Sequence, residues 1–142
     1  MKGFLLDTNV ISELRKGNRT DSHVLAWFQT TDETELFLSV LVLGEVRSGI
    51  EAKRAKDPAQ ARALERWLHG LETNYADRIV PVTAAIADRW GRLSAAHAPS
   101  VIDGLMAATA LEHDLTLVTR NVDDVKRTGV ALLNPFEIIA GQ

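Results

Sequence analysis

The sequence of 142 residues predicts an α/β domain in which a parallel sheet of four to five short strands lies between layers of helices. Two observations lead to this fold class. Short apolar runs of strand type alternate along the chain with segments whose apolar residues recur at helical spacing. The first run, 4–6, is uninterrupted by polar residues, which is typical of a strand buried on both faces of a parallel sheet. Such alternation predicts a sheet with helices on both faces, a three-layer α/β/α arrangement.

The first elements follow directly from the pattern of apolar and capping residues. The strand at 4–6 runs into Asp7, after which apolar positions up to Leu14 mark a helix. A second helix begins with Ser22 as its cap, and the apolar run 36–38 is a second strand. We expect the first strand to lie in the middle of the sheet, with Asp7 at the carboxyl end where ligands bind in such folds.

The next two helices, about 39–56 and 58–75, have no strong strand between them, so we expect a helical hairpin lying on the sheet. Ser39 opens the first of them, and Asp57 followed by Pro58 is a typical start for the second. The rest of the chain alternates again: a strand at 79–82, a helix capped by Thr83 and running towards His97, a helix at 101–112, a strand at 115–118, a short helix opened by Asn121 and a strand at 130–133. Pro81 places the strand at 79–82 at an edge or an end of the sheet.

Composition limits the class of protein without naming it. The chain is 46% hydrophobic and 25% charged, as expected for an ordinary soluble globular domain, and it has no run long enough for a signal-peptide core or a membrane span. The absence of cysteine excludes disulfides and a thiol nucleophile, so a metal site would have to use oxygen ligands and the 4 histidines. We therefore expect a cytoplasmic protein. The net charge of −3 provides no general attraction to nucleic acid, so a phosphodiester substrate would need local cations.

Four acids lie where strands end or helices begin: Asp7, Glu45, Asp103 and Asp124. Each also has a structural explanation. Asp7 is placed to cap the first helix, and Glu45 lies on the shoulder of an apolar stripe, where a solvated side chain is the commoner case. The other two stand three residues after Ser100 and Asn121 respectively, which is the spacing of a capping box.

Two of these acids lie in unusual surroundings. Gly44 and Gly49 flank Glu45, and each glycine weakens a helix interior by about 0.5–1 kcal/mol relative to alanine, which indicates that something needs room there. Asp103 falls among apolar residues on a helical wheel, so we expect its ionisation to cost more free energy than that of the other acids.

Taken together, the acids favour chemistry over capping. Asp7 and the loop 121–124 both follow carboxyl ends of strands, while Glu45 and Asp103 lie early on helices that start at the same edge of the sheet. Carboxylates that converge repel one another unless a cation lies among them. The pattern therefore predicts a hard divalent metal, Mg²⁺ or Mn²⁺, bound at that edge.

The sequence resembles a known family, the PIN-domain ribonucleases, and specifically the VapC-like toxins of type II toxin–antitoxin pairs. The resemblance runs nearly end to end and implies a single PIN-like domain over 1–142. Its specific segments are LDTNVISE at 6–13, SVLVLGEVRSG at 39–49, IDGLMAATA at 102–110 and LVTRNVDD at 117–124.

The resemblance also assigns roles to residues. It implies that the metal-binding and catalytic acids are Asp7, Glu45, Asp103 and Asp124, and that the polar residues supporting them are Thr8, Asn9, Thr119 and Asn121. The family usually has an aromatic residue after its fourth acid, where this chain has Val125. Because Asp123 lies beside Asp124, either of the two could be the fourth acid.

The function implied by the resemblance is that of an endoribonuclease toxin. A bound metal would polarise a phosphoryl oxygen and activate a water, leaving 5′-phosphate and 3′-hydroxyl ends. The implied partners are an RNA substrate and a cognate antitoxin, a segment of which lies in the groove between the helical hairpin and the sheet. The resemblance also implies a homodimer, which could form a larger assembly with the antitoxin. The basic residues that could hold RNA are Arg15, Lys16, Arg19, Arg47 and Arg120, although a solvated charged face explains each one singly.

Other functions remain open at this stage. A strand ending in an acid also opens the site of aspartyl-phosphate phosphotransferases, with Asp7 as nucleophile, but Asn9 replaces the second acid that would act as general acid. A phospho-accepting receiver domain would need paired acids after the first strand, which are missing. A PIN-like module that binds RNA or protein without cleaving is the remaining alternative. The three tryptophans occur among aliphatic residues at helical spacing, which favours packing in a core or dimer interface over base stacking.

Overall fold

The computed structural model describes residues 3–96 and 99–137, and its centre is a five-stranded sheet in which all paired strands are parallel. The strands lie in the order β3 (Ile79–Val80), β2 (Leu36–Ser39), β1 (Phe4–Leu6), β4 (Thr116–Val118) and β5 (Leu132–Leu133). The first strand is therefore central, as its uninterrupted apolar run predicts. The strand before Pro81 lies at the edge, which is also as predicted.

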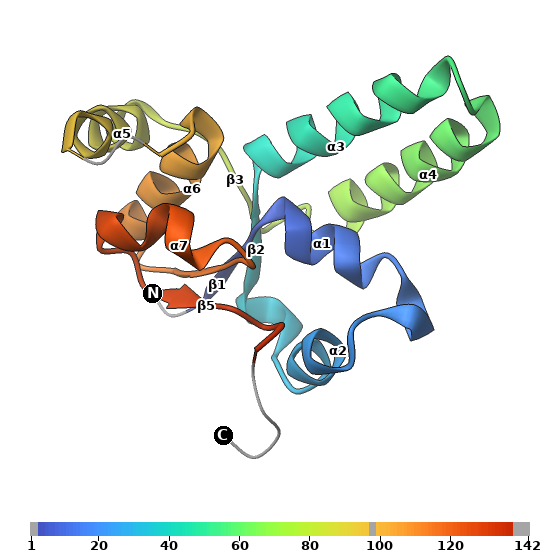
Figure 1. Cartoon of the computed structure of the whole chain (residues 1–142), viewed down its shortest axis with the longest axis horizontal. Coiled ribbons are helices and arrows are strands. Elements are labelled where there is room, and N and C mark those ends of the chain that lie inside the picture. Colours follow the sequence, from blue (N-terminus) through green and yellow to red (C-terminus); the bar gives the residue numbers. More distant parts are fainter. Residues whose placement is uncertain (1–2, 97–98, 138–142) are drawn as a thin grey trace.

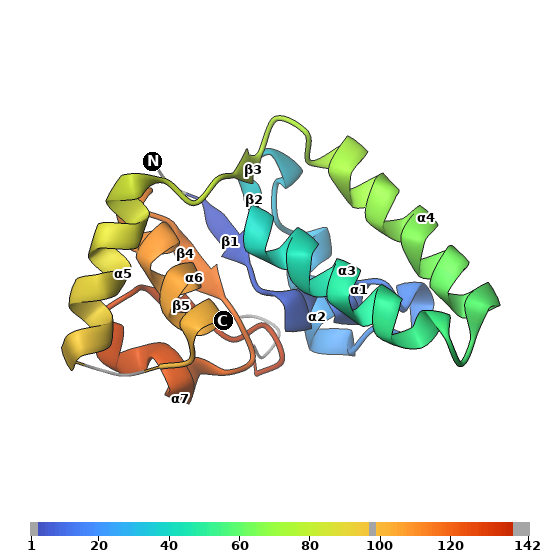
Figure 2. The same cartoon turned by 90° about the horizontal axis from the view of Figure 1, so that it is seen from above.

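Helices cover both faces of this sheet, which confirms the predicted three-layer α/β/α architecture (Figures 1 and 2). One side carries α1 (Thr8–Leu14), α2 (Ser22–Gln29), α3 (Val40–Arg54) and α4 (Pro58–Asn74). The other side carries α5 (Ala84–Ala96), α6 (Val101–Glu112) and α7 (Val122–Val125). Short 3-10 turns occur at Gly17–Arg19, Glu33–Glu35 and Lys126–Thr128. The predicted extension of α5 to His97 and the end of the predicted domain, 138–142, lie outside the described residues.

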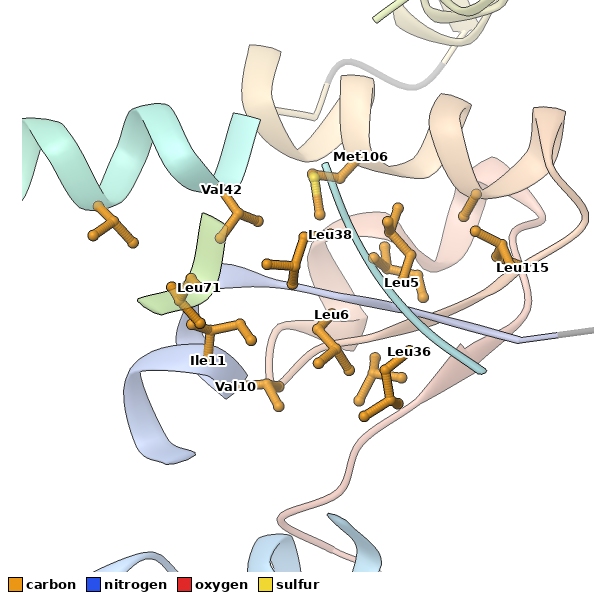
Figure 3. Close-up of a cluster of buried hydrophobic side chains, with 14 of the residues drawn as sticks. Leu5, Leu6, Val10, Ile11, Leu36, Leu38, Val42, Leu71, Met106 and Leu115 are labelled. Carbon is orange, nitrogen blue, oxygen red and sulfur yellow. The ribbon is translucent and has the colours of Figure 1, made fainter. Parts of the chain in front are cut away.

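The core is formed by side chains from all three layers. Leu5 and Leu6 have no exposed surface, and because successive strand residues point to opposite faces, both faces of β1 are buried. Figure 3 shows them in one cluster with Val10 of α1 and Met106 of α6. Full burial of a leucine side chain contributes about 1.5–3 kcal/mol, so this strand fixes the position of the residue that follows it.

Helix caps explain where most of the helices begin. The side chains of Ser39, Asp57 and Thr83 accept hydrogen bonds from backbone N–H groups at the starts of α3, α4 and α5, as predicted. The predicted cap of α2 is wrong by one residue: it is Asp21, whose Oδ1 accepts the N–H groups of the residues two and three positions on, at 2.9 and 3.2 Å. A carboxylate satisfies two free N–H groups here and interacts favourably with the helix dipole, whereas Ser22 already has helical conformation.

The predicted helical hairpin is present as α3 and α4, which pack along each other. Arg47 and Arg54 of α3 both reach Glu65 of α4, at 2.5 and 3.2 Å. The base of the hairpin is held by Arg78, whose guanidinium donates to the backbone carbonyls of Leu36 and Asn74. This arginine therefore ties the end of α4 to the start of β2. No helix in the described part of the chain is long and apolar enough to cross a membrane.

Candidate active site

Asp7 lies at the carboxyl end of β1 and is buried, with 7% of its surface exposed. Its backbone N–H continues the ladder to β4 by donating to the carbonyl of Val118 at 2.9 Å. Its side chain caps α1, since Oδ1 accepts the backbone N–H of Thr8 at 2.8 Å. Asp7 is therefore a helix cap, as its structural explanation predicts. The cap hydrogen bond uses only one of the two carboxylate oxygens.

The second oxygen of Asp7 is held by one residue of α1 and one residue of the loop after β4. Oδ2 accepts the hydroxyl of Thr119 at 2.7 Å and the amide of Asn9 at 3.3 Å. Asn9 in turn accepts the backbone N–H of Arg120 at 3.1 Å, and the Thr119 hydroxyl accepts the backbone N–H of Asn121 at 3.0 Å. These bonds tie the start of α1 to the loop after β4 and fix the orientation of the carboxylate.

Burial raises the pKa of Asp7, because the charged form loses hydration in the interior. The hydrogen bonds from Thr119 and from the N–H of Thr8 lower this pKa, whereas the nearby charges of Asp103 and Glu45 raise it further. The net direction is upward. The structure thus brings these three acids close enough for their charges to interact.

Glu45 reaches the site from the second turn of α3, which begins at the same edge of the sheet because Ser39 ends β2 and caps the helix. Its Oε1 accepts the hydroxyl of Thr8 at 2.5 Å. Thr8 therefore contacts both acids, giving its backbone N–H to Asp7 and its hydroxyl to Glu45.

Asp103 lies in the first turn of α6 and is half-buried. Ser100 caps this helix by accepting the backbone N–H of Asp103 at 3.3 Å, and no bond in the described part of the chain returns from the carboxylate to Ser100. Only half of the predicted capping box is formed, so the cap does not require the carboxylate. The expectation that Asp103 is the acid most costly to ionise is wrong, because Asp7 is the more deeply buried of the two.

The fourth candidate, Asp124, differs from the other three in being exposed. Asp123 and Asp124 are both exposed on α7, and Asp123 forms an ion pair of 3.3 Å with Lys126. Asn121 precedes this helix, but its side chain forms no cap bond, so the capping-box explanation fails here. Val125, which stands where the family usually has an aromatic residue, is buried in the core.

The donor set fits a hard divalent cation in its chemistry. Asp7, Glu45 and Asp103 offer carboxylate oxygens, and Mg²⁺ commonly uses one or two carboxylates while keeping several of its waters. Within residues 3–96 and 99–137, however, no three acidic or histidine side chains are spaced to hold an ion together. These acids could hold Mg²⁺ or Mn²⁺ with water completing the coordination.

The predicted RNA-binding cations differ in their surroundings. Lys16 pairs with Glu13 at 2.9 Å, and Arg47 is engaged with carboxylates of the hairpin. Arg120 lies over the ring of Phe136 at 4.4 Å, next to the Asp7 network, and Arg19 is exposed in the turn after α1. Arg15 lies over the ring of Trp67 at 5.8 Å.

Two cavities adjoin at Arg15 and Trp67, which line both of them. The smaller, of about 190 Å³, is also lined by Thr8, Glu45 and Lys53. The larger, of about 400 Å³, is lined mainly by apolar and aromatic side chains of α1, α2 and α4 together with Arg78.

Sequence reasoning missed Lys53, although a signal for it exists. Glu45, Gly49 and Lys53 recur every four residues and so share one face of α3. Of the tryptophans, Trp27 is buried and packs edge to face on Phe4, as predicted, while Trp67 lines the cavities.

Comparisons with known proteins identify the family. The model of the PIN domain family matches residues 4–130, and the chain therefore belongs to the PIN domain family. The chain is similar to the toxin FitB of Neisseria gonorrhoeae, with 30% identity over 138 residues that cover 94% of this chain and 98% of that protein. It is also similar to the VapC ribonuclease Y4jK of Sinorhizobium fredii, with 34% identity over 142 residues and the same coverage of 94% and 98%.

Solved structures support the same assignment. A chain in the crystal structure of FitAcB from Neisseria gonorrhoeae superposes with a TM-score of 0.85 at 28% identity, covering 95% of this chain and 99% of that one. A chain of DNA-bound VapBC from Salmonella typhimurium, at 20% identity, shows the fold alone, with a TM-score of 0.75 and coverage of 95% and 99%.

Proposed function

We propose that the protein is a metal-dependent endoribonuclease that acts as the toxin of a type II toxin–antitoxin pair. The observation that supports this most strongly is the meeting of Asp7, Glu45 and Asp103 at the carboxyl edge of the sheet of a PIN domain. Relatives at 30% and 34% identity over nearly the whole chain are named a toxin and a VapC ribonuclease, respectively. Activity on cellular RNA would place the protein in the cytoplasm.

In this proposal the bound ion, Mg²⁺ or Mn²⁺, supplies a Lewis acid and an activated water for phosphodiester hydrolysis. Thr119 and Asn9 hold one oxygen of Asp7, and Thr8 holds one oxygen of Glu45, so the carboxylates are oriented before the ion binds. A cation at the site would favour the charged form of Asp7 and so oppose the burial that raises its pKa. Asp124 remains the proposed fourth acid, contributed by α7.

The alternative of an aspartyl-phosphate phosphotransferase is less well supported. Asn9 stands where such an enzyme needs a second acid to act as general acid, and its amide donates a hydrogen bond to Oδ2 of Asp7 at 3.3 Å. The described site therefore lacks the proton donor that this reaction requires at that position. A non-cleaving binding module is the stronger alternative, since the same acids could hold an ion without hydrolysis.

We propose an antitoxin and a second copy of the chain as partners. The cavity of about 400 Å³ beside the hairpin has the apolar and aromatic lining that suits side chains of a bound antitoxin segment. It lies between the α1–α2 segment and α4 of the hairpin, whereas the resemblance implies a groove between the hairpin and the sheet.

The test is incubation of purified, partner-free protein with total RNA in Mg²⁺, Mn²⁺ or EDTA, followed by mapping of the RNA ends. Discrete cuts that depend on the metal and leave 5′-phosphate and 3′-hydroxyl ends are expected. RNA that stays intact under all three conditions, with a folded protein, would favour the binding module. A phosphate mimic trapped on Asp7 would instead favour the phosphotransferase.

A further inference from the structure

We infer that the cavity beside Glu45 is a subsite for the RNA backbone, in which Arg15 and Lys53 hold phosphate and an apolar wall holds the adjoining nucleotide. This inference rests on the proposed function, because it takes RNA as the ligand. It adds Lys53 to the residues that bind RNA, and it assigns a specific phosphate contact to Arg15 alone among the basic candidates predicted from the sequence.

The cavity extends from the acids to the two cations. Thr8 and Glu45 line it near the starts of α1 and α3, whereas Arg15 and Lys53 line it where the same helices end. At a rise of 1.5 Å per residue, the backbone positions of Glu45 and Lys53 are separated by about 12 Å along α3. An RNA strand with one phosphate at the acids would therefore bring a neighbouring phosphate towards the cations.

Arg15 and Lys53 are free to bind an anion. Neither of them forms an ion pair within the part of the chain that the structure describes, whereas Arg47 and Arg54 on the hairpin are engaged with carboxylates. The contact of Arg15 with the face of Trp67, at 5.8 Å, leaves its guanidinium N–H groups available. Because the net charge of the chain is −3, local cations of this kind are what a polyanion would require.

The wall between the acids and the cations suits a ribose or a base. It is formed by apolar side chains of the hairpin, among them Val46, Leu64 and Trp67. Gly49 leaves this part of the cavity open, since a Cβ atom built on it would meet no described atom within 4 Å other than those of its chain neighbours and its own helix backbone. An apolar wall of this kind makes no base-specific hydrogen bonds, which gives binding without strict sequence preference.

These features favour RNA over an acidic peptide of the antitoxin. An RNA strand presents a phosphate at every nucleotide, so it can occupy the metal site and the cations at once. A peptide would need acidic residues at one matching spacing, and its own carboxylates would compete with Glu45 for the ion.

The first test measures binding apart from cleavage. The affinity for a fluorescein-labelled RNA oligonucleotide of randomised sequence is measured in EDTA, by fluorescence anisotropy at several salt concentrations. Each phosphate contact on a single strand contributes about 0.7 to the slope of log affinity against log salt. Arg15→Gln and Lys53→Gln should each reduce the slope by about that amount. Arg62→Gln, which removes an exposed arginine of α4 that lines neither cavity, should leave it unchanged.

The second test fills the cavity. Gly49→Leu should raise KM for RNA at least several-fold with a smaller change in kcat, because the added side chain occupies the space of the nucleotide. Gly91→Leu on α5 is the matched control, since Gly91 is also an exposed helix glycine with open space around its Cβ. Both replacements should keep the protein folded, as glycine disfavours a helix interior.

The outcomes separate the two proposals. The binding of a fluorescein-labelled hexaglutamate peptide is measured in the same way as that of RNA. If Arg15→Gln and Lys53→Gln leave the salt slope of RNA binding unchanged, or weaken only the binding of this peptide, the RNA subsite is wrong whether or not the protein cleaves RNA. If the salt slopes of the two variants are smaller than that of wild type, as expected, but no metal allows cleavage, the subsite stands as an RNA-binding site and the proposed ribonuclease activity fails.

Discussion

The hydroxyl of Thr119 donates a hydrogen bond of 2.7 Å to Oδ2 of Asp7, across 112 positions of the sequence. This bond joins the end of the central strand β1 to the loop after its neighbour β4 and holds the most buried acid of the site in one orientation. Burial disfavours the charge of this carboxylate unless a cation is near, and the neutral hydrogen-bond donors orient it. Both effects suit a group that binds a cation.

Removal of this hydroxyl should therefore weaken the site. We expect Thr119→Val to lower metal-dependent RNA cleavage by about 10–100-fold, the size found for residues that orient metal ligands. Thr119→Ser keeps the hydroxyl and should remain within a few-fold of wild type. The measurement is the initial cleavage rate as a function of Mg²⁺ concentration, and equal rates for the valine and serine variants would contradict the positioning role.

The stability of the metal-free protein should depend on the ionisation of Asp7. Its pKa in the folded protein is raised, so the native state binds more protons than the unfolded state above the ordinary value of 3.8. Stability contributed by this group is therefore present at low pH and is lost as the pH rises through the raised pKa. In EDTA at neutral pH, Asp7→Asn should melt a few degrees above wild type, since about 1 kcal/mol corresponds to roughly 2–4 °C for a chain of this size.

The control for this prediction is Asp123→Asn, because the side chain of Asp123 is 86% exposed. Asp123→Asn should melt within about a degree of wild type both at neutral pH and at a pH of about 4. The gain for Asp7→Asn should shrink as the pH is lowered towards 4. A gain that is the same at acidic and neutral pH would show that burial of the charge is not its cause.

The choice between the tandem acids on α7 can be made by activity. We expect Asp124→Asn to reduce cleavage more than Asp123→Asn, since Asp123 is paired with Lys126 whereas Asp124 matches the position of the family's fourth acid. Cleavage rates of the two variants in saturating Mg²⁺ provide the measurement. If Asp123→Asn is the more damaging change, the fourth acid has to be reassigned.

Addition of metal should stabilise the wild-type protein through the same acids. A ligand that binds only the native state adds about 2.7 kcal/mol at 100 times its Kd, and Asp103→Asn should reduce this gain. Melting temperatures of both proteins in EDTA and in saturating Mg²⁺ measure it. An equal shift for the two proteins would mean that Asp103 takes no part in holding the ion.

Much of the fold could be predicted because local signals agree with one another. The apolar run at 4–6 forms the central strand, and Asp57 with Pro58 begins α4. The cap of α2 was missed because Asp21 and Ser22 are both good caps, and the choice depends on the turn before them. Glu13 helps to fix that turn, since its carboxylate accepts the N–H of Asp21 at 2.9 Å.

The candidate site was harder to predict, because exposure is decided by tertiary packing. Asp103 lies on an apolar helix face, yet it is half-buried, while Asp7 is covered by its own helix and by Thr119. Lys53 carries no motif, and although its spacing puts it on the same face of α3 as Glu45, its part in the site depends on the cavity that both residues line with Arg15, the C-cap of α1. Helical spacing alone could not show that this face of α3 meets α1.

The central claim is that Asp7, Glu45 and Asp103 together support hydrolysis of RNA through a bound ion. The most direct measurement compares the initial rates of RNA cleavage by wild type, Asp7→Asn and Asp103→Asn in Mg²⁺ and in EDTA, with circular dichroism to show that each variant is folded. We predict cleavage by wild type in Mg²⁺, none in EDTA, and loss of activity in both variants. A cleanly folded variant that cuts RNA at a rate near that of wild type would contradict the claim.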